Sequence, residues 1–128
     1  MSKQNVLKST NGTKEYKIYE TANFQQNLEE FSHLKPAVEN KLRFLKTNPF
    51  SGEPLKYELA GFRSIAVKRN FLILYGICRE CKKIMETKKT ISCTGFGDNS
   101  VVIYAFGPHD DLYKIARKII SNNNKQKT

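Results

Sequence analysis

The chain has 128 residues, of which 39% are hydrophobic, and it contains eight Phe and six Tyr, so it can form one domain with a modest core and is not a disordered chain. Lys and Arg outnumber Asp and Glu by 22 to 12, and the net charge of +10 favours polyanions or acidic proteins as partners. The sequence has no run of about 18 apolar residues, which excludes a helix that spans a membrane.

Polar sequence without periodicity marks both ends of the chain. It predicts flexible tails over residues 1–14 and 121–128, which leaves one domain over residues 15–120. The N-terminal residues lack the apolar segment of a signal peptide, and the odd number of cysteines, three, disfavours a secreted disulfide framework. We therefore expect a cytoplasmic protein without membrane contact.

The first half of the domain has the pattern of a strand followed by two helices. Alternation over residues 16–20 predicts the strand, and Thr21 is placed to cap a helix over residues 22–33. Pro36 suits the first turn of a second helix, which ends at Asn48-Pro49. The short connection predicts that the two helices are antiparallel. Their apolar residues recur every three or four positions and form one stripe, made of Phe24, Leu28, Phe31, Leu34, Val38, Leu42 and Leu45.

The second half has the pattern of three strands and a last helix. Residues 50–54 predict a turn, and residues 57–68 and 71–78 predict two strands joined across Arg69-Asn70. Residues 101–106 predict a third strand, and Asp110-Asp111 favours the start of a helix. The polar residues 79–99 predict a surface insertion. The strand residues expected to face the helical stripe are Ile65, Val67, Ile73 and Tyr75.

Four segments in a fixed order carry a resemblance to a known family. Each is unspecific alone, whereas the four with this spacing form a specific set. They are Asn48-Pro49-Phe50-Ser51-Gly52 followed by Pro54-Leu55, then Leu59-Ala60-Gly61-Phe62-Arg63-Ser64-Ile65-Ala66-Val67, then Ile73-Leu74-Tyr75, and finally Phe106-Gly107-Pro108-His109-Asp110-Asp111-Leu112-Tyr113. Together with the order of the predicted elements, they make residues 16–120 similar to the RelE/ParE toxin superfamily, the toxins of type II toxin–antitoxin pairs.

The resemblance implies an α+β fold. An N-terminal strand and a helical hairpin would pack on a curved antiparallel sheet of about four strands, with a short C-terminal helix. In ribosome-dependent members of the family, the concave basic face of the sheet clamps mRNA. The ribose 2′-hydroxyl then attacks the adjacent phosphate without a metal, helped by Lys and Arg charges and often by a C-terminal Tyr.

The resemblance also implies a function and partners. It identifies the chain as a cytoplasmic toxin that inhibits translation, acting as a ribosome-dependent mRNA endoribonuclease. A cognate acidic antitoxin would bind and neutralise it, through a disordered segment that folds in a groove around the helical hairpin. DNA contact would be indirect, through the complex with the antitoxin.

The chain departs from the family at its basic positions. On alignment, these positions fall on Ser64, Ala66 and Leu72, the Arg of the last motif is replaced by His109, and Tyr113 is kept. Nuclease activity is therefore one of several hypotheses. The alternatives are a ParE-like gyrase inhibitor, a non-catalytic binding protein with the toxin fold, and a small RNA-binding domain that stacks bases on Tyr57, Phe62 or Tyr104.

Five residues near these motifs are still able to act on a phosphodiester. We expect His109, Tyr113 and Arg63 to be catalytic, and Arg63, Lys68 and Arg69 to bind RNA phosphates. An imidazole can donate or accept a proton near neutral pH, and Tyr113 lies one helical turn after His109. Each has a structural alternative: His109 as a cap of the last helix or a hydrogen-bonding partner of the sheet edge, Arg63 as a solvated cation at a strand edge or an ion-pair partner of the antitoxin, and Tyr113 as an aromatic residue at the rim of the core.

Cys78, Cys81 and Cys93 match the first three ligands of a zinc ribbon, because thiolates separated by two residues can bind one tetrahedral ion. The fourth ligand is due near position 96, which is Phe96, and His109 could replace it only if the insertion folded back. Ordinary thiols are the expected state, with a zinc site or a redox disulfide between Cys78 and Cys81 as alternatives. We expect no metal and no cofactor.

Overall fold

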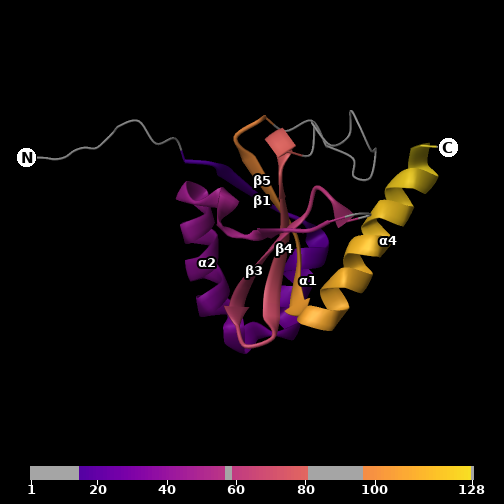
Figure 1. Cartoon of the computed structure of the whole chain (residues 1–128). Coiled ribbons are helices and arrows are strands. Elements are labelled where there is room, and N and C mark those ends of the chain that lie inside the picture. Colours follow the sequence, from indigo (N-terminus) through magenta and orange to yellow (C-terminus); the bar gives the residue numbers. More distant parts are fainter. Residues whose placement is uncertain (1–14, 57–58, 81–96, 128) are drawn as a thin grey trace, which may run out of the picture.

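The computed structural model describes residues 15–56, 59–80 and 97–127, whose arrangement Figure 1 shows. Most of the predicted insertion and the predicted N-terminal tail lie outside these ranges. None of the helices in the described part is long and apolar enough to cross a membrane. In chain order the elements are β1 (Lys17–Glu20), α1 (Ala22–Glu30), α2 (Lys35–Thr47), β2 (Glu53–Pro54), β3 (Arg63–Lys68), β4 (Phe71–Ile77), β5 (Ser100–Pro108) and α4 (His109–Lys127), with 3₁₀ helices at Ser32–Leu34 and Pro49–Ser51.

The five strands form one sheet in the order β1-β5-β4-β3-β2. The pairs β2–β3, β3–β4 and β4–β5 are antiparallel. Strand β1 pairs with β5 in parallel, with Ile18 opposite Val101. The expected α+β fold, in which an N-terminal strand and a helical hairpin accompany four antiparallel strands, is therefore confirmed. The parallel pairing of β1 was not predicted, because alternation indicates a strand without indicating its neighbour.

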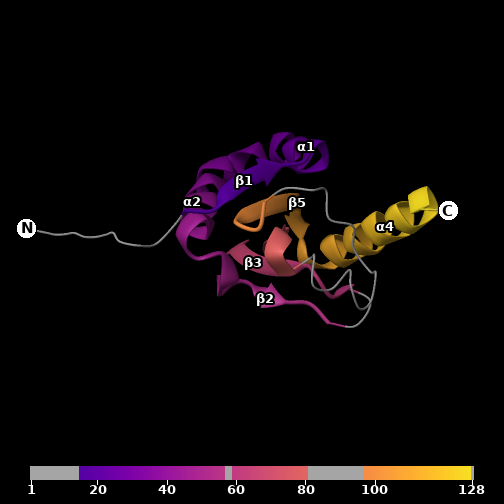
Figure 2. The same cartoon turned by 90° about the horizontal axis from the view of Figure 1, so that it is seen from above.

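Helices α1 and α2 run in opposite directions along one face of the sheet (Figures 1 and 2). Their apolar stripe packs against strand residues that point toward it, which confirms the predicted core. The buried members are Phe24, Leu34, Val38, Leu42, Leu45, Ile73, Tyr75, Ile77, Val101, Ile103 and Phe106, with Leu28, Phe31, Ile65 and Val67 partly buried against them. We call this the helix face of the sheet.

Helix α4 packs on the opposite face, and Figure 2 shows it apart from α1 and α2. Its residues Leu112 and Ala116 are buried against Leu74 and Ala105 of the sheet. Because both faces are covered, β4 is buried throughout residues 73–77, as its continuous apolar run predicts. We call this the pocket face, because the candidate site described below lies on it.

Side chains of α1 and its cap complete the edge of β5 beyond the end of β1. Thr21 caps α1 as predicted, by accepting a hydrogen bond from a backbone N–H of the first turn. A buried strand edge would otherwise leave polar groups unpaired. Side chains satisfy much of this edge: the Thr21 hydroxyl lies within hydrogen-bond distance of Ile103 O (2.9 Å) and Tyr104 O (3.1 Å), Asn23 Nδ2 donates to Tyr104 O (3.1 Å) and Asn27 Oδ1 accepts from Phe106 N–H (2.9 Å).

Three of the differences from the predicted boundaries change the architecture. Strand β3 begins at Arg63 rather than at residue 57, because residues 59–61 turn and Gly61 adopts φ 106°. The predicted turn at residues 50–54 contains the short strand β2, which pairs with β3. Helix α4 is not short and continues to Lys127, where the sequence predicts a tail. Polar residues can extend a helix whose first turns are already held by packing, which their composition alone does not reveal.

We predict that Leu42→Ala lowers the free energy of unfolding by about 2–5 kcal/mol, because it removes packed methyl groups and leaves a cavity. Leu42 is 8% exposed on α2, within the helix-face core. Phe44→Ala is the matched control, since Phe44 lies on the same helix and is 43% exposed. Urea unfolding of both variants measures the difference. Equal losses would contradict the assignment of this stripe to the core.

Candidate active site

A pocket of about 290 Å³ lies on the pocket face, between the edge of the sheet and the first turns of α4. It brings together His109 and Tyr113, which the sequence predicts to be catalytic. It also contains the three positions at which the resemblance places cations. Its lining consists of Ser51, Gly52, Glu53, Ser64, Ile65, Ala66, Leu72, His109 and Tyr113, without a Lys or Arg from the described part of the chain.

His109 and Tyr113 lie one turn apart at the start of α4, and their rings contact each other edge to face. The ring centroids are 4.8 Å apart and the planes are inclined by 68°. The His109 side chain is 53% exposed, and its Nδ1 lies 3.3 Å from Asp110 Oδ1 on a fully exposed carboxylate. An ion pair so open to water is weak and leaves the imidazole available. The two rings therefore offer two proton-transfer groups to one pocket.

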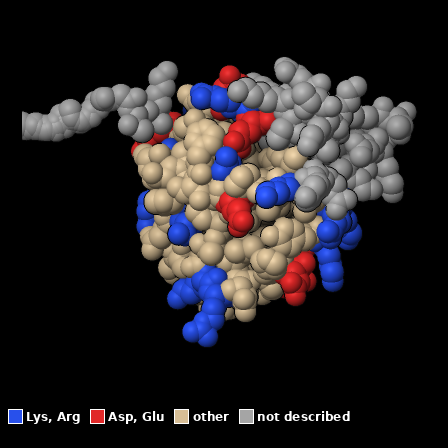
Figure 3. Space-filling view, viewed as in Figure 1, with Lys and Arg blue, Asp and Glu red and all other residues tan. Residues whose placement is uncertain are grey.

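Lys68 and Arg69 are exposed at the turn that joins β3 to β4. Asn70 takes the left-handed conformation there, with φ 59°, and its carbonyl accepts a hydrogen bond from the His109 N–H at 2.8 Å. The turn is therefore tied directly to the first residue of α4. Figure 3 shows Lys and Arg side chains gathered at the lower end of the molecule, where Figure 1 places this turn. The two predicted RNA-binding cations thus lie beside the pocket.

Arg63 is not part of this pocket. Successive residues of a strand point to opposite faces, and Ser64 lines the pocket. Arg63 stands opposite Tyr75 of β4, whose side chain belongs to the helix-face core. The structure therefore brings His109 and Tyr113 together and separates both from the third predicted catalytic residue.

The guanidinium of Arg63 is held by internal partners. It forms a bidentate ion pair with Glu80, with Nε 2.9 Å from Oε1 and Nη2 2.8 Å from Oε2. Nη1 donates to the backbone carbonyls of Phe50 (3.1 Å) and Gly52 (2.6 Å). The hydrogen bond to Glu80 raises the pKa of Arg63 above its ordinary value, so the group stays charged. With its side chain only 11% exposed, Arg63 is engaged within the protein rather than presented to RNA.

The hydroxyl of Tyr75 binds the backbone of the same segment, residues 49–52. It donates to Pro49 O (2.7 Å) and accepts a hydrogen bond from the Gly52 N–H (2.9 Å). Burial raises the pKa of Tyr75 above its ordinary value. A Cβ atom at Gly52 would collide with the Tyr75 hydroxyl and with Ser64 O, so no other residue fits there without movement. We call Pro49–Gly52, Arg63, Tyr75 and Glu80 the clamp.

Glu53 and Ser51 are pocket residues that the sequence does not identify. Their segment is predicted only as a turn. In the structure, Glu53 belongs to β2 and pairs with Ser64 of β3, so it lies along the pocket edge. Glu53 adds a carboxylate to the imidazole and the phenol. Glu53 stands between the motif residues Gly52 and Pro54, which is the one sequence feature that could have drawn attention to it. A single carboxylate in a predicted turn does not indicate that it shares a pocket with His109 and Tyr113.

The structure describes one of the three cysteines. Cys78 is 3% exposed and follows the end of β4, whereas Cys81 and Cys93 lie outside the described residues. Within residues 15–56, 59–80 and 97–127, no group of three His, Cys, Asp or Glu side chains is placed to hold a metal.

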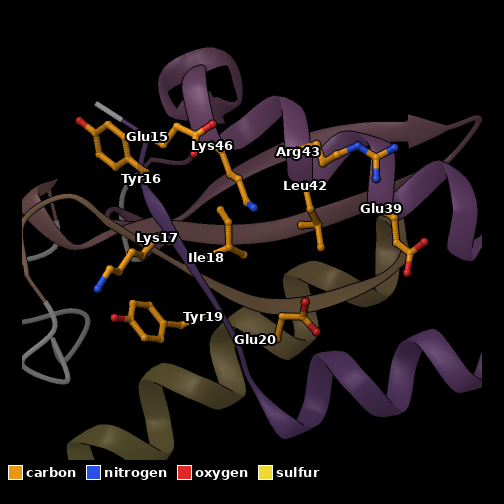
Figure 4. Close-up of a pocket in the computed structure, with 10 residues that line it drawn as sticks. All are labelled: Glu15, Tyr16, Lys17, Ile18, Tyr19, Glu20, Glu39, Leu42, Arg43 and Lys46. Carbon is orange, nitrogen blue, oxygen red and sulfur yellow. The ribbon is translucent and has the colours of Figure 1, made fainter. Parts of the chain in front are cut away.

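A larger hollow of about 800 Å³ follows the outer edge of β1 beside α2 (Figure 4). Figure 4 shows Ile18 and Leu42 near its centre, with charged side chains around them. A second hollow of about 440 Å³ lies between α1 and α2 and shares Glu20, Glu39 and Leu42 with the first. The two hollows adjoin at these shared residues, and we call them together the hairpin groove. A groove at this place was predicted.

Tyr75→Phe should destabilise the protein by about 1–3 kcal/mol at neutral pH, because two buried backbone groups lose their partner. The difference should shrink above the pH at which an unfolded Tyr ionises, about 10. The pKa of Tyr75 is raised in the folded state, so its contribution is complete below that pH and is lost as pH rises further. Unfolding of both proteins by urea between neutral pH and pH about 11 measures this. A difference independent of pH would contradict the raised pKa of Tyr75, and no loss at neutral pH would contradict the assigned hydrogen bonds.

No family model matches the chain, and no curated protein matches it significantly. Among solved structures, it is similar to a chain in the crystal structure of the toxin–antitoxin complex RelBE2 from Mycobacterium tuberculosis. The two are 23% identical with a TM-score of 0.51, and the match covers 73% of this chain and 98% of that chain. At this level of identity the similarity concerns the fold. The chain therefore has the RelE-like fold that its motifs predict.

Proposed function

We propose that this protein is the toxin of a type II toxin–antitoxin pair and that it cleaves mRNA on the ribosome without a metal. The observation that carries the proposal is the pocket shared by Glu53, His109 and Tyr113. It lies on the sheet of a RelE-like fold, and most of its lining residues belong to the sequence motifs that carry the family resemblance. The net charge of +10 supports an RNA substrate, because Lys and Arg bind phosphates with release of counterions.

Cleavage of RNA by its own 2′-hydroxyl needs three contributions. One group accepts the proton of the 2′-hydroxyl, a second donates a proton to the departing 5′-oxygen, and positive charge stabilises the phosphate oxygens. Glu53, His109 and Tyr113 can supply the two proton transfers. The 2′,3′-cyclic phosphate and the free 5′-hydroxyl balance the reaction, because the proton taken from one oxygen is matched by the proton given to the other.

The positive charge that this reaction needs comes from residues beside the pocket, not from its described lining. Ser64, Ala66 and Leu72 occupy the places where the family resemblance expects cations, so the lining itself is uncharged there. Lys68 and Arg69 lie on the adjoining turn and can hold the phosphates on either side of the cleaved bond. We assign them to binding and the pocket residues to chemistry.

The absence of Lys and Arg from the described lining favours a second candidate function, a toxin fold without nuclease activity such as a gyrase inhibitor. The two candidates differ in the process they stop. Pulse labelling after induction, with and without the neighbouring reading frame, distinguishes them. Loss of protein synthesis before DNA synthesis supports the nuclease, and the reverse order supports gyrase inhibition.

The hairpin groove is the surface that we assign to the antitoxin. It has an apolar centre and the cations Lys17, Arg43 and Lys46 in its lining. These features suit an acidic, disordered segment that folds on binding. Carboxylates also line it, so the net charge of the whole protein provides much of the attraction.

His109→Ala should lower cleavage of ribosome-bound mRNA by roughly 100- to 10,000-fold, the loss typical of a general acid or base. Lys68→Ala should instead raise KM, because it removes a phosphate contact. His33→Ala is the matched control, since His33 is exposed on the Ser32–Leu34 helix, outside the pocket lining. Primer extension on ribosome-bound mRNA gives the rates. Equal activity of wild type and His109→Ala, or none in either, would remove this mechanism.

Affinity for the antitoxin should decrease as salt increases, because exposed ion pairs are screened. Lys46→Glu, in the hairpin groove, should weaken binding on the order of a few-fold. Lys114→Glu carries the same charge change on an exposed residue of α4 and controls for the net charge. Titration calorimetry with the co-encoded protein at low and high salt gives both values. Equal effects of the two variants would place the antitoxin elsewhere.

A further inference from the structure

We infer that Arg63 is a positioning residue, which fixes the Ser51–Glu53 rim of the pocket from the opposite face of the sheet and so places Glu53, without itself touching RNA. The inference rests on the proposed function for its catalytic consequence. Its structural part, the fixing of the rim, depends on geometry alone.

The rim is a segment that its own backbone holds weakly. Strand β2, which begins at the last residue of the rim, has two residues and pairs with β3 only through Glu53 opposite Ser64 and Pro54 opposite Arg63. It is also the outermost strand of the sheet, with β3 as its neighbour. So short an edge strand contributes few ladder hydrogen bonds, and other groups must define where Glu53 lies.

Side chains on the helix face hold the rim in position. The Gly52 carbonyl accepts from Arg63 Nη1 at 2.6 Å, and the Gly52 N–H donates to the Tyr75 hydroxyl at 2.9 Å. Both backbone groups of the residue before Glu53 are thus bound to side chains. Arg63 also bonds Phe50 O at 3.1 Å, and its guanidinium lies 5.3 Å from the centre of the Phe50 ring. One guanidinium thus binds the carbonyls on both sides of Ser51.

Glu80 sets the orientation of that guanidinium. A bidentate carboxylate fixes the plane of an arginine side chain, since it engages Nε and Nη2 at once. Here those bonds measure 2.9 and 2.8 Å, and they leave Nη1 directed at the rim. The two side chains are 11% and 29% exposed, so the pair is shielded from most of the solvent. A lysine would keep the charge at this place but lose the fork that reaches both partners.

The first experiment tests the fixing of the rim and requires no enzymatic activity. Amide hydrogen exchange in the full chain is compared between wild type, Arg63→Lys and Glu80→Gln. We expect faster exchange at Ser51, Gly52 and Leu55, whose N–H groups are hydrogen-bonded in the structure, and unchanged exchange in α1. Arg43→Lys, on an exposed arginine of α2, is the matched control. Unchanged exchange at the rim in a folded Arg63→Lys or Glu80→Gln protein overturns the inference.

The second experiment tests the catalytic consequence by a double-mutant cycle. Arg63→Lys should lower kcat for mRNA cleavage by up to roughly 100-fold, the effect of a small misplacement, with KM unchanged. In the Glu53→Gln background it should cause no further loss, because Arg63 acts through Glu53. Losses that multiply, as for general destabilisation, overturn the link to Glu53. A wild type without cleavage overturns the proposed nuclease function instead, and hydrogen exchange then decides the inference by itself.

Discussion

The buried hydroxyl of Tyr75 is the constraint on which the arrangement of the site depends. A hydroxyl inside a core must find partners, and here both partners are backbone groups of the Pro49–Gly52 segment. The ring of Tyr75 belongs to the helix-face core, so the position of the segment follows from the packing of the hairpin on the sheet. The requirement for glycine at position 52 has the same origin, since a side chain there would occupy the place of the hydroxyl. The Tyr75 hydroxyl therefore links the packing of the core to the shape of the pocket.

The two faces of the sheet have different roles. The helix face holds most of the apolar core and the clamp, whereas the pocket face carries the polar groups that can act on a substrate. Because β3 alternates, neighbouring residues serve opposite roles: Arg63 is a structural cation and Ser64 lines the pocket. A basic residue in a family-like motif is thus no guide to catalysis until its face is known. Lys68 and Arg69, the cations of the β3–β4 turn, are exposed and lie outside the clamp.

Much of the fold could be predicted from the sequence, because it is local in origin. The stripe from Phe24 to Leu45, the cap at Thr21 and the connection of two strands across Arg69-Asn70 each follow from short-range patterns. The meeting of His109 with Tyr113 was predicted as well, since both lie on one helical turn. The place of Arg63 was not, because its partner Glu80 lies 17 residues away and only the folded sheet brings them together. The same holds for Glu53 and for the parallel pairing of β1 with β5.

The edge of β5 has a consequence for how the chain folds. Its contacts with Thr21 and Asn27 join residues 82 and 79 positions apart, and β1 has β5 as its neighbour in the sheet. During synthesis, the first strand and helix therefore emerge long before the strand that completes them. Their apolar stripe lacks its partners Val101, Ile103 and Phe106 until residues 100–108 are made, and contacts so distant in sequence slow folding. A partner made at the same time can reach the hairpin while its sheet is still incomplete.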